Sequence, residues 1–112
     1  MRGQALKGHL DLLLLATLSD GAKHGYAVIE RLRERSEDTF GLPEGTVYPA
    51  LHRLEKGGLL SSEWSAVGGR NRRTYQLTDK GRGALVEQRR AWDEFASAVA
   101  SVLERSEWPA TA

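Results

Sequence analysis

Residues 44–56 read EGTVYPALHRLEK and predict a helix with two unlike faces. Apolar side chains recur at helical spacing on one face, and the opposite face carries no acid. The apolar positions are Val47, Ala50, Leu51 and Leu54, and the opposite positions are Thr46, Pro49, His52, Arg53 and Lys56. We expect a loose first turn, because the ring of Pro49 clashes with the carbonyl of Gly45. The polar face is either an ordinary solvated surface or one that contacts a partner, and spacing alone leaves both open.

A β-hairpin with a basic tip is predicted after this helix. Gly57 and Gly58 end the helix, and residues 60–66 and 72–77 alternate as half-buried strands around a turn at 68–71. The basic residues from 64 to 82 are Arg70, Arg72, Arg73, Lys80 and Arg82, against the single acid Asp79. The arginines either keep the turn soluble or anchor a phosphate. Alternation places Arg72 and Arg73 on opposite faces, so we expect one to reach a partner and the other to pack against the domain.

Two helices are predicted before residue 44. Residues 6–18 carry apolar side chains on two faces, so we expect one face to meet the core and the other to meet a partner chain. Residues 24–36 form the second helix, with Tyr26, Ile29 and Leu32 on one stripe. Core packing is the ordinary interpretation of Tyr26 on such a stripe, and a contact with a partner stays open. His24 is expected to cap the helix rather than to act as a ligand or catalyst.

A long last helix is predicted from a Thr78 cap to residue 103 or 104. Leu85, Trp92 and Val99 are seven residues apart, and Phe95 and Val102 fill the intervening positions of the heptad pattern. Because this heptad pattern is short, we expect it to form an interface together with the apolar first helix rather than a coiled coil by itself. We divide the chain into residues 1–78, residues 79–105 as a dimerisation helix, and a disordered tail over 106–112 that holds Trp108.

Composition excludes several classes of protein. The chain has 112 residues, 40% hydrophobic residues and no cysteine, which indicates one domain in a reducing cytoplasm without disulfides. No signal segment or membrane span is evident, because the longest apolar run covers only residues 12–16. The three histidines lie on three different predicted helices, and no nucleophile elbow or phosphate-binding glycine loop occurs. We therefore expect no enzyme activity, no metal and no cofactor.

The order of elements predicts a mainly α fold with a small β-hairpin, namely a winged helix-turn-helix followed by a long dimerisation helix. A helix of this kind fits the major groove of DNA, and a basic hairpin beside it reaches phosphates or the minor groove. The same fold can instead serve as a protein-protein interaction module, since fold alone does not dictate function. The basic tip favours DNA.

Several blocks of the sequence resemble the PadR family of bacterial transcription regulators, over residues 5–104 and in the same order. These blocks are Leu6-Lys7-Gly8, His24-Gly25-Tyr26, residues 44–55 with Gly57-Gly58-Leu59-Leu60 and Trp64, Gly69 to Tyr75, and Leu77-Thr78-Asp79-Lys80-Gly81. Two departures are Pro43, where the family often has a Ser or Thr cap, and Thr74, where a second aromatic is common. They affect the expected start of the third helix, not the resemblance.

The resemblance implies a homodimeric, ligand-responsive DNA-binding repressor, although activation stays open. The implied DNA-binding residues are Lys7, Tyr26, Thr46, Tyr48, Pro49, His52, Arg53, Arg70, Arg72 and Arg73. In multidrug-responsive members, tryptophans of the two last helices flank a flat aromatic effector, which implies such a pocket here. Its expected lining is Leu14, Leu15, Trp92, Phe95 and Ala96, and the expected dimer interface is Leu12, Leu85, Trp92, Phe95, Val99 and Val102. Trp92 either stacks on a small planar aromatic effector or only packs in the seam.

Overall fold

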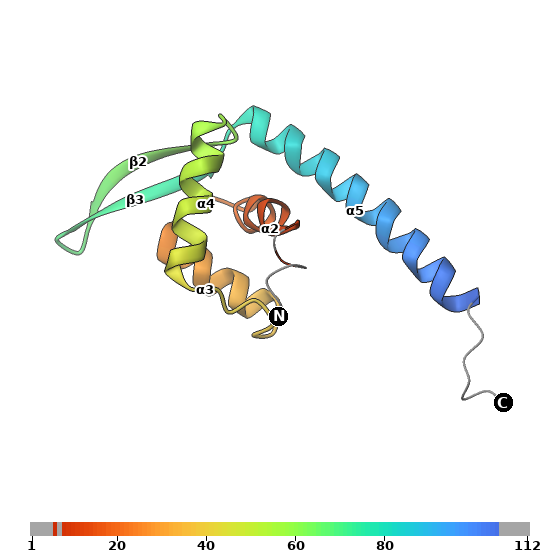
Figure 1. The fold of residues 1–112 in the computed structure, drawn as a ribbon. Helices are drawn as coiled ribbons and strands as arrows, with labels where there is room; N and C mark the ends of the chain where they lie inside the picture. Colours follow the sequence, from red (N-terminus) through yellow and green to blue (C-terminus); the bar gives the residue numbers. More distant parts are fainter. Residues whose placement is uncertain (1–5, 7, 106–112) are drawn as a thin grey trace.

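The computed structural model, which describes residue 6 and residues 8–105, combines four named helices with three strands (Figure 1). In chain order they are α2 (Leu10–Thr17), β1 (Lys23–His24), α3 (Gly25–Arg35), α4 (Glu44–Lys56), β2 (Leu60–Val67), β3 (Arg70–Leu77) and α5 (Asp79–Arg105). The β2–β3 hairpin projects from one side of the helices, and α5 runs away from the other side. This is the predicted mainly α architecture, with its hairpin and long last helix.

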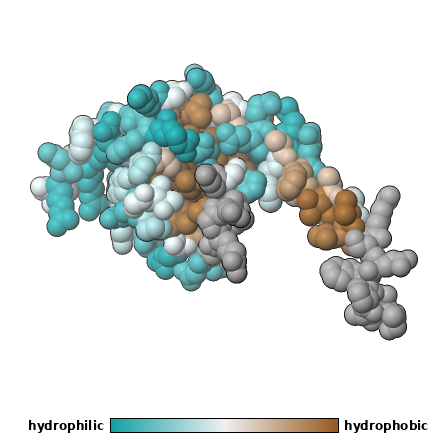
Figure 2. Space-filling view, viewed as in Figure 1, coloured by the Kyte–Doolittle hydropathy of each residue, from teal (hydrophilic) through white to brown (hydrophobic). Residues whose placement is uncertain are grey.

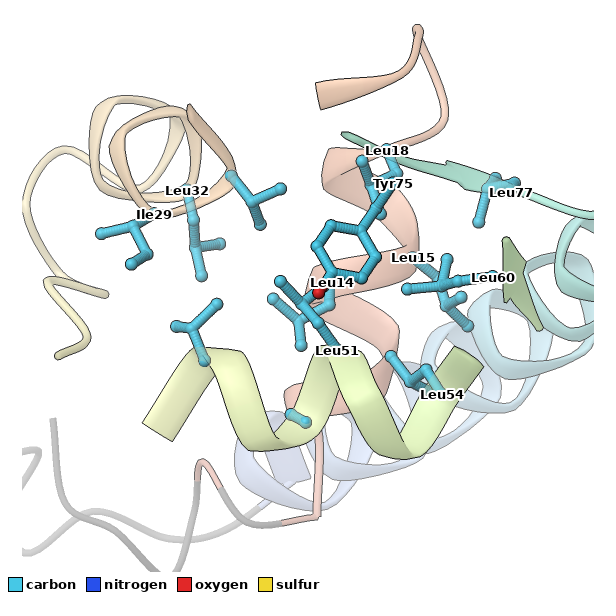
Figure 3. Close-up of a cluster of buried hydrophobic side chains, with 13 residues drawn as sticks. Leu14, Leu15, Leu18, Ile29, Leu32, Leu51, Leu54, Leu60, Tyr75 and Leu77 are labelled. Carbon is cyan, nitrogen blue, oxygen red and sulfur yellow. The ribbon is translucent and has the colours of Figure 1, made fainter. Parts of the chain in front are cut away.

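The hydrophobic core lies between α2, α3, α4 and the sheet (Figure 3). Leu14 and Leu15 of α2, Leu51 of α4 and Tyr75 of β3 have almost no exposed surface. Figure 3 shows the ring of Tyr75 among the leucines of α2 and α4. The predicted apolar face of α4 is buried throughout, so the opposite face is left open to a partner.

The sheet has three strands, in the order β1-β3-β2, where the sequence predicted only a two-stranded hairpin. The two residues of β1 pair antiparallel with Tyr75 and Thr74 of β3. The turn between β2 and β3 is only Gly68–Gly69, both with positive φ, which is the two-residue geometry that glycine favours. Arg70 and Asn71 therefore belong to β3 rather than to a flexible turn.

Three further expectations about the elements are corrected. The predicted helix over residues 6–18 is not one continuous element: Leu6 is helical and buried, Gly8 and His9 form a turn, and α2 covers Leu10–Thr17. Pro49 does not loosen α4, which runs unbroken from Glu44 to Lys56 with Pro43 at its N-cap. Trp64, predicted to be half-buried in its strand, is 66% exposed.

The long helix α5 starts at the predicted cap, where the Thr78 hydroxyl accepts a hydrogen bond of 3.0 Å from the Gly81 amide. Its first part packs against α2 and β3, and the rest leaves the helical body (Figure 1). Apolar side chains gather on that projecting part, as the brown surface in Figure 2 shows. Among the residues that the structure describes, no helix combines the length and apolar character that crossing a membrane requires.

Candidate nucleic-acid interface

The open face of α4 carries Pro49, His52, Arg53 and Lys56, all exposed. His52 and Arg53 follow Pro49 by three and four residues and precede Lys56 by four and three, so the four residues share one side of the helix. Arg53 is not a free cation on this face, because its two terminal nitrogens lie 2.6 and 3.1 Å from the two carboxylate oxygens of Asp11 on α2. These hydrogen bonds raise the pKa of the Arg53 guanidinium above its ordinary value. The sequence did not predict this partner.

A groove of about 520 Å³, here called the wing groove, lies between the first turns of α3 and α4 and the hairpin. It is lined by His24, Gly25, Tyr26, Glu44, Tyr48, Trp64, Arg70, Asn71, Arg72 and Arg73. Helix N-termini present backbone amides and a positive dipole end. Arg70 and Arg72 add positive charge, whereas Arg73 is paired with Glu55 and Glu44 contributes an acid. The wing groove therefore suits an anion such as a DNA phosphate.

Tyr48 is held in the wing groove by the absence of a side chain at Gly25. A Cβ on Gly25 would lie 2.3 Å from Cε1 and 2.9 Å from the hydroxyl oxygen of Tyr48. The tyrosine ring thus occupies the space above the first turn of α3. Burial raises the pKa of the Tyr48 hydroxyl, and Glu44 adds to the effect, so the group keeps its proton and can donate a hydrogen bond to a phosphate oxygen.

Two of the three arginines that line the wing groove form hydrogen bonds with other side chains of the protein. Arg72 reaches Nε2 of His24 at 2.9 Å. Arg73, on the other face of β3, donates to the Ser62 hydroxyl at 2.7 Å and to Glu55 of α4 at 3.1 Å, and its guanidinium lies 5.6 Å from the ring centre of Trp64. Arg70 makes no ion pair with any residue that the structure describes and is exposed.

His24 holds Arg72 weakly. Its Nδ1 already accepts the hydrogen bond of 3.2 Å from the Ala27 amide that caps α3, which is the predicted capping role. In a neutral imidazole only one of the two ring nitrogens can accept a hydrogen bond. When Nδ1 accepts from the Ala27 amide, Nε2 carries the proton and cannot accept from the Arg72 guanidinium. A phosphate oxygen is a stronger acceptor for Arg72 than Nε2 of such a ring. Arg72 is therefore positioned toward the wing groove yet available to an anion.

The structure thus distributes the predicted DNA-binding residues over two neighbouring surfaces. Tyr26, Tyr48, Arg70, Arg72 and Arg73 line the wing groove, while Pro49, His52 and Arg53 lie on the open face of α4. Tyr26 is 54% exposed, which corrects the interpretation that its ring packs in the core. Thr46 is half-buried in the first turn of α4, and Lys7 lies outside the described residues.

Sequence reasoning missed Trp64, Asn71, Glu44 and His24 as residues of the wing groove. A signal for Trp64 was present: the two-glycine turn pairs Val67 with Arg70 and therefore Trp64 with Arg73 on one face. No signal was present for His24, whose contact with Arg72 joins residues 48 positions apart.

Replacing Gly25 with alanine should weaken DNA binding while leaving the protein folded. The atoms nearest to the new Cβ are outer atoms of the Tyr48 side chain, which can rotate away, but the hydroxyl then leaves the wing groove. We expect a loss of about 1 to 3 kcal/mol in DNA affinity, similar to Tyr48→Phe and to His52→Ala. Fluorescence anisotropy with labelled DNA measures the affinity, and Gly45→Ala is the control because its Cβ would meet nothing within 4 Å.

Stability should fall on mild acidification because of His24. Burial, and then the charge of Arg72, lower its pKa below the ordinary value of 6.5. The unfolded chain therefore binds a proton more readily, so this contribution is intact above pH 6.5 and is lost as the pH falls toward the folded pKa. Urea unfolding at several pH values measures this. His24→Asn keeps a capping side chain without titrating, so its stability should fall less; equal falls would refute the assignment.

A second cavity, the α2–α5 cavity, has a volume of about 580 Å³. It is lined by Gly8, His9, Asp11, Leu12, Arg53, Gln88, Ala91, Trp92 and Phe95. The ring of Trp92 meets the ring of His9 edge-on at 4.9 Å and lies 6.2 Å from that of Phe95. Two predicted lining residues are corrected: Leu14 and Leu15 are fully buried in the core, and Leu12 lies at the cavity instead. Ala96 is half-buried and does not line it.

The predicted interface residues of α5 divide into two groups. Leu85 is partly buried against the core, so it belongs to the contact between α5 and the helical body. Trp92, Phe95, Val99 and Val102 are between 39% and 67% exposed, and Leu103 and Val86 join them. Leu12 on α2 is half-buried.

The fold and the wing groove define a winged helix-turn-helix protein. The family model described as "Transcriptional regulator PadR-like family" matches residues 14–87. Transcriptional regulator Rv3488 of Mycobacterium tuberculosis is 44% identical over 88 residues, which are 79% of each chain. The chain belongs to the PadR-like family of transcriptional regulators, so the resemblance seen in the sequence is confirmed.

Solved structures agree with this family. A PadR-like transcriptional regulator from Bacillus cereus is similar with a TM-score of 0.81 and 30% identity, covering 94% of this chain and 100% of that one. A PadR family transcription regulator from Clostridium difficile has a TM-score of 0.77 and 32% identity, covering 86% of this chain and 99% of that one. The likeness to these structures confirms the predicted fold class. The family and these relatives are transcriptional regulators, which confirms the prediction that the chain is no enzyme.

Proposed function

We propose that the chain acts in the cytoplasm as a homodimeric, sequence-specific DNA-binding repressor. The observation that carries the proposal is the wing groove, where two helix N-termini and three arginines converge beside the open face of α4. In this proposal α4 lies in the major groove, and Pro49 and His52 face the edges of the bases. The hairpin then follows the adjacent backbone, with Arg70 and Arg72 on phosphates. Lys7 is proposed as a further phosphate contact.

The projecting part of α5 supports the proposal of a dimer. Phe95, Ala98, Val99, Val102 and Leu103 together line a shallow apolar surface there. An apolar helix face that a single chain leaves to water is most simply covered by the same face of a second copy around a two-fold axis. Two copies of α4 would then read two half-sites, and the bound dimer would exclude the polymerase from the DNA it covers.

The test is fluorescence anisotropy of the full chain on the DNA upstream of its own gene and on a scrambled duplex, across a salt series. We expect tight, saturable binding to the upstream fragment and a log-log salt slope that corresponds to several phosphate contacts. Equal, weak binding to both DNAs would count against an operator there. Partner capture would then address the alternative, a winged helix that contacts proteins.

We also propose that a small planar aromatic effector binds in the α2–α5 cavity against Trp92 and Phe95. The cavity is roomy, partly apolar and lined by aromatic rings, and a dimer partner would close its open side. Planar aromatic compounds should quench tryptophan fluorescence. The quenching should disappear in Trp92→Ala and persist when Trp64 and Trp108 are replaced, and persistence in Trp92→Ala would exclude this site. Release of DNA by the same compounds would make the protein ligand-responsive.

A further inference from the structure

The ion pair between Asp11 and Arg53 joins the helix that lines the α2–α5 cavity to the helix proposed to read DNA. Asp11 stands in the first turn of α2 and Arg53 in the last turn of α4, 42 residues apart. Both terminal nitrogens of the guanidinium face both carboxylate oxygens, at 2.6 and 3.1 Å. A two-nitrogen, two-oxygen pairing of this kind fixes the direction of the arginine as well as its charge.

The position of the pair places it where DNA is proposed to lie. Arg53 follows Pro49 by four residues and His52 by one, so it belongs to the open face of α4. Its side chain is 58% exposed and that of Asp11 is 34% exposed, so the carboxylate is on the surface rather than in the core. Phosphates beside an inserted α4 would therefore meet an ion pair without net charge instead of a free guanidinium.

We propose that Asp11 withholds Arg53 from DNA and thereby sets both the affinity of the protein and the salt dependence of its binding. The carboxylate and a DNA phosphate compete for the same guanidinium, because the fork that binds one cannot bind the other in full. The inference rests on the proposed function, since it requires that the open face of α4 contacts DNA.

The same pair supplies a physical link to the α2–α5 cavity. Asp11 and Arg53 both line that cavity, together with Trp92 and Phe95 of α5. Any change in the cavity that separates the two helices by more than hydrogen-bond reach frees Arg53, and any change that tightens the pair holds it back. The pair thus connects the cavity to the charge on the open face of α4.

The test compares four full-length proteins: the wild type, Asp11→Asn, Arg53→Gln and the double variant. Asparagine has the shape of aspartate without the charge. Anisotropy titrations on the upstream fragment and on the scrambled duplex, across a salt series, measure Kd and the salt slope. We expect Asp11→Asn to bind about fivefold more tightly at low salt. Its log-log slope should be steeper by about 0.9, the value for one added phosphate contact.

The double variant shows whether the gain comes from Arg53. The gain in affinity and slope should vanish when Arg53→Gln is already present. Asp38→Asn is the matched control, because Asp38 is also an exposed partner of an arginine, Arg33, at 3.1 Å, and the variant changes the net charge equally. Thermal melting checks that each variant is folded.

Other results would overturn the inference in distinguishable ways. Weaker binding by Asp11→Asn would mean that Asp11 positions Arg53 for DNA instead of withholding it. A gain that persists without Arg53, or that Asp38→Asn reproduces, would be a general effect of charge. If the wild type does not prefer the upstream fragment, the result counts against the proposed function. If the wild type prefers it and Asp11→Asn has the same Kd and salt slope as the wild type, only the inference about Asp11 is refuted.

Discussion

Replacing Gly81 with alanine should destabilise the protein by about 3 kcal/mol, because the added Cβ would collide with the backbone. It would lie 2.0 Å from the carbonyl oxygen and 3.0 Å from the carbonyl carbon of Leu59. That oxygen also accepts the hydrogen bond of 3.1 Å from the Thr78 amide, so moving it disturbs the junction between the sheet and α5. Thermal unfolding should show a fall in Tm of about 15 °C for a chain of this size.

Gly83→Ala is the matched control on the same helix. Its Cβ would meet nothing within 4 Å, and alanine is the better helix former by about 1 kcal/mol, so this variant should be slightly more stable than the wild type. A Gly81→Ala protein as stable as the wild type would mean that the close approach of α5 to Leu59 is not required. The loss should extend to DNA binding, because the direction of α5 sets the proposed dimer.

Periodicity predicted the helices well because burial is periodic. The four apolar positions of α4 are buried as the spacing predicted, and Thr78 caps α5 as expected. The strand β1 could not be predicted, because two residues carry no alternation. The family resemblance implied Leu14 and Leu15 at a pocket. The first helix is apolar on two faces, so only the packing of α3, α4 and the sheet decides which of its leucines are covered.

The composition of the candidate site was predictable, but its electrostatics were not. The arginines at the tip of the hairpin stand out in the sequence, and the structure brings them together with Tyr26 and Tyr48. Their partners come from distant segments: Arg72 contacts His24, and Arg73 contacts Glu55. A charge on a predicted face therefore cannot be counted as available until the fold shows which acids lie beside it.

Removing Arg70 and Arg72 together should cost about 3 kcal/mol in DNA affinity, which is roughly a hundredfold in Kd. Both side chains line the wing groove; Arg70 has no ion-pair partner among the described residues, and Arg72 is held only by the His24 ring. Each should bind one phosphate, so the salt slope of Arg70→Gln/Arg72→Gln should fall by about 1.8. The loss should be similar for the upstream and scrambled DNA, because phosphate contacts carry no sequence information.

The control variant Arg33→Gln/Arg90→Gln also removes two positive charges, but from residues outside the wing groove. Both residues are exposed and paired with acids of their own helices, Glu30 and Glu87. This control should change the salt slope little, because its arginines already have carboxylate partners. Equal losses from both double variants would show that only the total charge matters, and the wing groove would then have no special part in binding. A loss confined to the upstream fragment would instead mean that Arg70 or Arg72 reads bases, as an arginine does in a narrow minor groove.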